Sequence, residues 1–189
     1  MFNLPNILTL SRIAMLPVLM VFFFIPAPWA AWSALGIYTL AAITDFLDGY
    51  LARSMDQISS FGKFLDPISD KIFVATLLLI LVGFDRLTGV WIIPAIVILM
   101  REFLVAGLRE YLGPLNVQLP VSKLAKWKTT VQMVATGFLI LGPHAPLGTE
   151  IGLIALLIAA VLTLVTGTQY LTKALPHILS NDSSSSIGE

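Results

Sequence analysis

Six long apolar segments constrain this chain more than any other feature of its sequence. Each is near the ~20 residues that a helix needs to cross the hydrocarbon core of a bilayer. Only helices and closed barrels satisfy the backbone in lipid, and these runs are too continuous for the alternating pattern of a barrel. We therefore predict an all-α integral membrane protein with six transmembrane helices. The segments cover residues 6–26, 30–52, 64–84, 89–112, 123–143 and 148–172.

Composition supports a membrane protein and excludes several other classes. The chain is 57% hydrophobic and 12% charged, whereas a soluble domain carries roughly 25% charged residues. The net charge is +0, which does not favour nucleic-acid binding, and the absence of cysteine excludes disulfides and thiolate metal sites. Residues 1–176 are predicted to form one six-helix transmembrane domain. Residues 177–189 are rich in serine and are predicted to be a disordered tail.

The positions of the basic residues predict an orientation in the membrane. The chain has eleven Lys and Arg residues. If the N-terminus lies on the cytoplasmic side, ten of the eleven fall at cytoplasmic helix ends or in cytoplasmic loops, and only Arg86 falls on the opposite side. Cytoplasmic loops carry an excess of Lys and Arg. We therefore predict that the ends of the second and third spans near residue 56 face the cytoplasm.

Four aspartates lie at helical spacing on either side of the connection between the second and third segments. Two are three residues apart and two are four apart, so each pair shares one face of its helix. If the two helices face each other, four carboxylates converge on one place. The pairs are Asp45 with Asp48, and Asp66 with Asp70.

Converging carboxylates require a compensating positive charge. They cannot all stay ionised without one, and a single ionised Asp in a span costs ~2.5–3.5 kcal/mol. Divalent cations resolve both problems, and an all-oxygen ligand set favours Mg²⁺ or Mn²⁺. Two such ions are a known device for phosphoryl transfer, and Mg²⁺ is often held by carboxylates together with substrate phosphates. The alternative is that the aspartates only pair with nearby cations, namely Arg53, Lys63 and Lys71.

The same residues resemble the signature of the CDP-alcohol phosphatidyltransferase family. The motif reads Asp45-x-x-Asp48-Gly49-x-x-Ala52-Arg53, eight residues, then Gly62-x-x-x-Asp66-x-x-x-Asp70. The resemblance implies that the four aspartates bind two divalent ions and that Asp70 also acts as the general base. It implies a homodimer in a plasma membrane, and a CDP moiety contacted by Gly49, Arg53 and Ser59, with Gly62 keeping the nucleotide cleft open.

The start of the first segment resembles one group within that family. Asn6 and Thr9 lie along one side of a helix, with Arg12 or Ile13 a turn further on. The stretch is also typical of a simple helix start, with Pro near the first turn. It resembles the Pro-Asn-x-Leu-Thr-x-x-Arg entry of phosphatidylglycerophosphate synthases, where it borders the nucleotide site. That resemblance adds Asn6 and Thr9 to the expected CDP-binding residues.

Basic residues surround the connection between the fourth and fifth segments. A phosphorylated acceptor such as glycerol 3-phosphate requires a cationic pocket of this kind, more than choline, ethanolamine or serine does. Arg101 lies in the middle of the fourth segment, and we expect Glu102, Glu110 or the acidic cluster to offset its charge. The lysines alternatively serve as topology determinants attracted to anionic headgroups. The predicted acceptor-phosphate residues are Arg101, Arg109, Lys126 and Lys128.

The segment Ser122–Thr129 also resembles phosphatidylglycerophosphate synthases, in their Ser-x-x-Gly-Lys-x-Lys-Thr pattern. Ala125 stands where that pattern usually has Gly, which leaves the acceptor less determined than the reaction class. The predicted reaction transfers a phosphatidyl group from CDP-diacylglycerol to glycerol 3-phosphate and releases CMP. The alternatives are a cardiolipin synthase or phosphatidylinositol-phosphate synthase of the same class, a divalent-cation transporter, or a structural membrane subunit.

Overall fold

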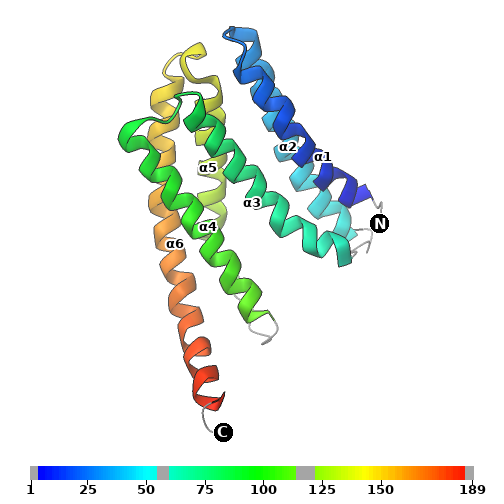
Figure 1. Ribbon diagram of the computed structural model, residues 1–189, viewed down its shortest axis with the longest axis vertical. Coiled ribbons are helices and arrows are strands. Elements are labelled where there is room, and N and C mark those ends of the chain that lie inside the picture. The colour runs from blue at the N-terminus through cyan, green and yellow to red at the C-terminus, as the bar shows by residue number, and fades with distance from the viewer. Residues whose placement is uncertain (1–3, 55–59, 114–121, 186–189) are drawn as a thin grey trace.

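The computed structural model describes residues 4–54, 60–113 and 122–185, and in those ranges every regular element is a helix. Six long helices coincide with the six apolar segments, which confirms the predicted all-α class (Figure 1). Two short 3₁₀ helices lie in the connections. In chain order the elements are α1 (Leu4–Phe23), α2 (Pro28–Ser54), α3 (Ser60–Gly83), η1 (Gly89–Trp91), α4 (Ile92–Leu112), α5 (Lys123–Leu141), η2 (Gly142–His144) and α6 (Gly148–Ser185).

The six helices run alternately up and down the bundle (Figure 1). The connections α1–α2, α3–α4 and α5–α6 lie at one end, whereas the start of α1, the end of α2 and the start of α3 lie toward the other. We call this second end the charged end, because the predicted aspartates and basic residues belong to the helix portions that point to it. An alternating path is what six successive membrane crossings require.

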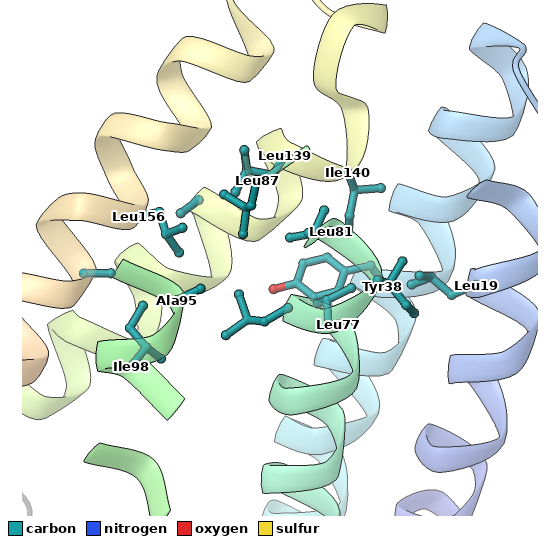
Figure 2. Close-up of a cluster of buried hydrophobic side chains, with 14 of the residues drawn as sticks. Leu19, Tyr38, Leu77, Leu81, Leu87, Ala95, Ile98, Leu139, Ile140 and Leu156 are labelled. Atoms are coloured by element: carbon teal, nitrogen blue, oxygen red, sulfur yellow. The ribbon is translucent and has the colours of Figure 1, made fainter. Parts of the chain in front are cut away.

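The helices pack as two groups of three. Helix α1 packs against α2 and α3, and α6 packs against α5 and α4. The groups meet where α2 contacts α5 and where α3 contacts α4. Fully buried side chains from both groups, such as Leu81, Ile98, Leu139 and Leu156, form the core that joins them (Figure 2). In lipid such contacts hold helices together mainly through close van der Waals packing.

In the part of the chain that the structure describes, three helices are long and apolar enough to cross a membrane by length and hydropathy, within Asn6–Phe23, Gly89–Leu112 and Gly148–Ile178. Helices α2, α3 and α5 are 27, 24 and 19 residues long, but they do not meet the combined criterion of length, hydropathy and low charge. Large apolar side chains also point outward from the bundle, for example Leu79 and Met100. Such a surface suits lipid and not water. The chain is an integral membrane protein, and the count of six spans stays a prediction.

The C-terminal segment differs from the prediction. Helix α6 continues to Ser185, past the domain end predicted at residue 176, so residues 177–185 are helical where a disordered tail was expected. Pro176 lies inside this helix. A proline removes one backbone hydrogen bond and bends a helix, but it need not end one. Residues 186–189 lie outside the described part of the chain.

Candidate functional site

Arg12 joins three helices at the charged end. Its Nη1 atom lies 2.6 Å from Oδ1 of Asp45 on α2 and 2.6 Å from Oδ1 of Asp70 on α3. The Arg12 side chain is 4% exposed, whereas the two aspartates are 51% and 59% exposed. The guanidinium is therefore held inside the bundle, and the carboxylates extend from it toward open space. This geometry confirms that the α2 and α3 acidic faces converge, for one aspartate of each pair.

The N-terminal half of α1 presents a polar face to the rest of the protein. Asn6, Thr9 and Arg12 recur every three residues and are 3%, 1% and 3% exposed. The structure thus confirms that Asn6 and Thr9 share one side of α1, and it selects Arg12 over Ile13 as the third member. One turn further on, Leu16 continues the same face as part of the core. Burial of three polar residues in succession indicates a polar site and not lipid contact on this face.

Several predicted residues lie outside what the structure describes. Asp48, Gly49 and Arg53 belong to α2 and Asp66 to α3, but their side chains are not described. Ser59 precedes α3 and lies outside the described residues. Gly62 is buried in the first turn of α3. The roles of these positions stay predictions.

The observed carboxylates fit the chemistry of a divalent ion. Asp45 and Asp70 place one oxygen each beside a single nitrogen atom, so the two oxygens are close neighbours. Hard cations such as Mg²⁺ take ligands of this kind. No group of three or more His, Cys, Asp or Glu side chains comes together within the described residues. The four-aspartate metal centre therefore stays a prediction that the Asp45–Asp70 pair fits.

A cavity of about 200 Å³ opens between the two helix groups beside Arg12. Asp45 and Asp70 border it from one group, and Glu102 and Lys128 border it from the other. Its deeper wall is apolar and aromatic. That wall includes Tyr38, Phe73, Leu77, Leu78 and Met133. The acidic cluster and the basic segment, which the sequence predicted separately, are therefore two sides of one cavity.

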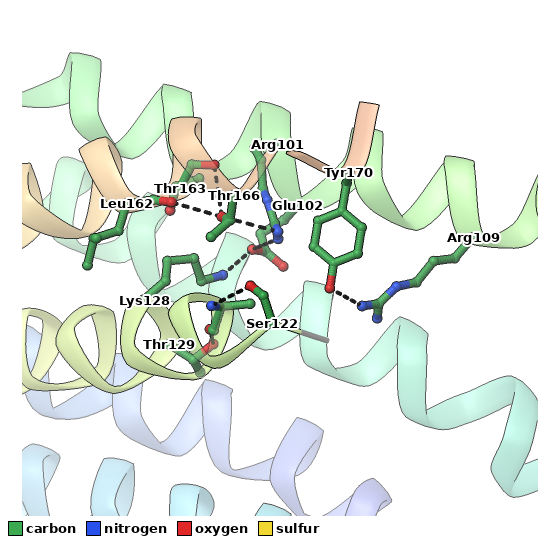
Figure 3. Close-up of polar contacts among 11 residues, drawn as sticks. Arg101, Glu102, Arg109, Ser122, Lys128, Thr129, Leu162, Thr163, Thr166 and Tyr170 are labelled. Carbon is green, nitrogen blue, oxygen red and sulfur yellow. Dashed lines mark hydrogen bonds and ion pairs between the residues drawn. The ribbon is translucent and has the colours of Figure 1, made fainter. Parts of the chain in front are cut away.

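Glu102 is the centre of the basic side (Figure 3). Its Oε1 atom accepts hydrogen bonds from Lys128 Nζ at 2.5 Å and from Arg101 Nη1 at 3.1 Å. The side chains of Lys128 and Arg101 are only 6% and 11% exposed. This confirms the expectation that Glu102 offsets the charge of the mid-span Arg101. Two cations share one carboxylate, so one positive charge remains at the cavity wall.

Helix α6 supports the basic residues, a role that the sequence did not reveal. The Tyr170 hydroxyl accepts a hydrogen bond from Arg109 Nη2 at 3.1 Å. The guanidinium carbons of Arg101 and Arg109 each lie 5.3 Å from the centre of the Tyr170 ring, within range of a cation–π attraction. Thr166 Oγ1 lies 3.4 Å from Arg101 Nη2. Tyr170 thus fixes two of the predicted acceptor-site arginines at once (Figure 3).

The four predicted acceptor-phosphate residues do not all meet. Lys128 borders the cavity, and Arg101 joins it through Glu102. Arg109 lies on the other side of Tyr170 from Arg101, with its Nη2 atom 3.1 Å from the Tyr170 hydroxyl (Figure 3). Lys126 is exposed, although Lys128 two residues later is buried. On a helix, residues two apart do not share a face.

Comparison with known proteins gives a consistent result over most of the chain. The family model described as CDP-alcohol phosphatidyltransferase matches residues 2–165. Several curated proteins named CDP-diacylglycerol–glycerol-3-phosphate 3-phosphatidyltransferase are similar to the chain. One from Rickettsia bellii is 47% identical, and the match covers 89% of this chain and 93% of that protein.

Two further relatives with the same name come from other bacteria. The protein of Cereibacter sphaeroides is 41% identical, over 94% of this chain and 97% of its own length. The protein of Pseudomonas fluorescens is 39% identical, over 93% and 92%. The similarity therefore includes all six long helices and both sides of the cavity.

Proposed function

The chain belongs to the CDP-alcohol phosphatidyltransferase family, and from that premise we propose that it transfers the phosphatidyl group of CDP-diacylglycerol to glycerol 3-phosphate and releases CMP. The observation that carries this proposal is the single cavity bordered by Asp45 and Asp70 on one side and by Lys128 and Glu102 on the other. A transfer between two phosphate-bearing substrates requires an acidic, metal-compatible side and a cationic side within reach of each other.

The acidic side is the proposed donor site. The residues that would hold two divalent ions, Mg²⁺ or Mn²⁺, are Asp45, Asp48, Asp66 and Asp70. When bound, the ions supply positive charge to the pyrophosphate of the donor and to the departing CMP. The proposed CDP contacts are Asn6, Thr9, Gly49, Arg53, Ser59 and Gly62. Among them, the burial of Asn6 and Thr9 on the α1 face that ends at Arg12 supports a polar role.

Asp70 is the proposed general base. Its side chain is 59% exposed and borders the cavity, so one carboxylate oxygen is accessible to an acceptor hydroxyl while the other is held by Arg12. A base must come within about 3 Å of the proton that it accepts. Arg12 fixes the orientation of the carboxylate and supplies positive charge beside the reacting phosphate. Proton removal by Asp70 allows the acceptor oxygen to attack the phosphorus that bears the lipid.

The basic side is the proposed acceptor site. Lys128 and Arg101 together carry two positive charges, and Glu102 carries one negative charge. The net charge of this side of the cavity is therefore positive, and it attracts the phosphate of glycerol 3-phosphate. An incoming phosphate competes with Glu102 for the ammonium group of Lys128. Because Lys128 borders the cavity, the phosphate would bind in the cavity and not deeper in the bundle. Arg109 and Lys126 are the outer members of the proposed set. A neutral or cationic alcohol would gain little from this arrangement.

An acceptor assay tests the proposal. The purified protein is given CDP-diacylglycerol, Mg²⁺ or Mn²⁺, and in turn labelled glycerol 3-phosphate, phosphatidylglycerol or inositol phosphate. We expect CMP release only with glycerol 3-phosphate. Release with another alcohol alone would replace the acceptor assignment. Metal flux into sealed vesicles, without CMP release for any acceptor, would instead identify a divalent-cation transporter.

The proposed setting is a plasma membrane with the charged end in the cytoplasm. The bias of Lys and Arg toward one set of helix ends supports it. Because the chain has no cysteine, a single cysteine introduced at Lys173 or at Leu147 reports the two ends separately. A membrane-impermeant thiol reagent applied to whole cells should label only the second variant. A homodimer is proposed from the family resemblance alone, and the mass of the purified protein tests it.

A further inference from the structure

The end of the bundle opposite the charged end holds one arginine in a tight turn. Arg86 follows α3, and its backbone N–H donates to the Leu81 carbonyl at 2.8 Å. The N–H of Leu87 donates to the same carbonyl at 3.1 Å, and the Leu87 side chain is fully buried. The turn is therefore anchored at Arg86 and at the residue that follows it. Its side chain has a fixed starting point and reaches across to a different helix pair.

The Arg86 side chain packs on Gly142, at the end of α5. A methyl group placed at Gly142 would lie 2.5 Å from Arg86 Nη1 and 2.8 Å from its Cζ, far inside normal contact. Gly142 also has φ +50°, which residues other than glycine seldom adopt. The positive φ selects glycine here, and the Arg86 guanidinium lies directly against the face that carries no side chain. Arg86 joins the α3–α4 turn to the α5–α6 turn.

Arg86 carries a charge that the described residues do not balance. Its Nε atom is buried without a hydrogen-bond partner, and the residue forms no ion pair in the ranges that the structure describes. Two acidic residues at this end of the bundle, Asp85 in the same turn and Glu150 in the first turn of α6, are exposed and form no ion pair with Arg86 within the described residues. Burial lowers the pKa of the Arg86 guanidinium from its ordinary value. A partly desolvated cation without a counter-charge is unfavourable, and a bound anion would remove the penalty.

A cavity of about 140 Å³ lies beside this guanidinium. Arg86 and His144 are its basic members, and Phe22, Phe23 and Phe84 line its apolar part. The outer aromatic contacts continue to Trp29, whose ring meets Phe22 edge to face at 6.2 Å. Tryptophan is typical of the level of lipid headgroups, so Trp29 places the cavity near that level. An anion here would have a cationic fork on one side and an aromatic, lipid-like wall on the other.

We propose that this cavity binds the phosphate group of a membrane lipid in the leaflet opposite the catalytic site. The planar guanidinium of Arg86 presents paired donors that match two phosphate oxygens, and His144 adds a third polar contact. The apolar wall accommodates the first carbons of the lipid. None of the residues of this cavity borders the catalytic cavity. The lipid therefore acts as a clamp between the α3–α4 and α5–α6 turns and not as a substrate.

Binding is tested on the delipidated full-length protein in a neutral detergent. Short-chain phosphatidic acid, the matching diacylglycerol without phosphate, and inorganic phosphate are added separately. Retention is measured by native mass spectrometry and the thermal midpoint by intrinsic fluorescence, since a ligand that binds only the folded state raises the midpoint. Phosphatidic acid should bind and diacylglycerol should not. If inorganic phosphate raises the thermal midpoint and phosphatidic acid does not, the ligand of the cavity is a free anion and not a lipid.

Substitutions assign the binding to this cavity. Arg86→Gln should weaken the binding of phosphatidic acid about tenfold or more. Arg86→Lys keeps the charge but loses the paired donors of the guanidinium, so it should have an intermediate effect. Lys128→Gln reports binding at the catalytic cavity, and Lys173→Gln is the neutral control. If Arg86→Gln does not fold, Arg86→Lys carries the test. Phosphatidic acid affinities of Arg86→Gln and Arg86→Lys equal to that of the unmodified protein would overturn the proposal.

Discussion

Arg12 and Asp70 are 58 residues apart in the sequence and 2.6 Å apart in the structure, Nη1 to Oδ1. The same nitrogen is 2.6 Å from Asp45, so one guanidinium on α1 organises the acidic faces of α2 and α3. Two of the four aspartates of the family motif are thus oriented by a residue outside that motif. This relationship leads to the first two predictions.

Arg12→Gln should lower kcat by about 10²-fold, because it removes both the orientation of Asp70 and a positive charge beside the reacting phosphate. It should also lower the free energy of unfolding by about 1–3 kcal/mol, since two carboxylates lose their shared donor. Steady-state kinetics and thermal unfolding in detergent measure the two effects. Ser11→Ala, one residue away, is the control. Full activity of Arg12→Gln would show that the ion pairs are incidental.

Asp70→Asn should reduce the rate by about 10²- to 10⁴-fold, the range for loss of a general base. The amide keeps the size of the side chain and one oxygen, so binding of Mn²⁺ should be weakened but not abolished. Electron paramagnetic resonance of bound Mn²⁺ separates these outcomes. Asp85→Asn, an exposed aspartate at the other end of the bundle, should change neither. An unaltered rate in Asp70→Asn would refute its assignment as the base.

Lys128→Gln should raise KM for glycerol 3-phosphate by about tenfold or more, with little change in KM for CDP-diacylglycerol, because Lys128 borders the cavity on the acceptor side. Lys126→Gln should have a smaller effect, since Lys126 is exposed. Lys173→Gln serves as the neutral control. Two-substrate kinetics measure both constants. Equal effects of the two substitutions on KM would argue for a general headgroup attraction instead of a defined acceptor site.

Tyr170 is predicted to act as a positioning residue for Arg101 and Arg109. Tyr170→Phe keeps the ring and loses the hydroxyl that accepts from Arg109, and it should raise KM for glycerol 3-phosphate about 2- to 10-fold. Tyr170→Leu also loses the cation–π contacts and should raise it further, to about 10- to 100-fold. A merely structural role would instead lower the thermal midpoint of both variants and leave KM unchanged.

Gly152 on α6 is predicted to set the distance between α5 and α6. A methyl group at this position would lie 2.7 Å from Leu139 Cγ and 3.0 Å from the Leu139 backbone nitrogen. Gly152→Ala should therefore destabilise the fold by about 1–3 kcal/mol. Gly36→Ala on α2 is the matched control: apart from its own helix backbone, no atom lies within 4 Å of its added carbon, so it should be neutral or slightly stabilising. Thermal midpoints of the two variants make the comparison.

Much of the fold could be predicted because its signals are local. Each apolar segment ends at Gly, Pro or polar residues, and the observed helices begin and end close to those positions. The end of α6 could not be predicted in this way, since the Ser-rich composition after residue 179 resembles a tail, whereas the structure continues the helix to Ser185.

The site could be predicted only in part. Helical spacing placed Asp45 and Asp70 on converging faces. Whether Arg12 or Ile13 faces them depends on the rotation of α1 about its axis, which its packing against α2 and α3 determines. The shared cavity depends on contacts between α2 and α5, which no local pattern encodes. Tyr170 gave no signal because one aromatic residue in an apolar membrane helix is unexceptional.

The central claim is that the acidic and basic sides of one cavity transfer a phosphatidyl group to glycerol 3-phosphate. The most direct test measures phosphatidylglycerophosphate and CMP formed by the purified protein from CDP-diacylglycerol and labelled glycerol 3-phosphate, with Mg²⁺ or Mn²⁺. The account predicts equal amounts of both products, lost in Asp70→Asn and restored in Lys128→Gln by excess glycerol 3-phosphate. CMP formation that is independent of glycerol 3-phosphate, or that requires another alcohol, would contradict it.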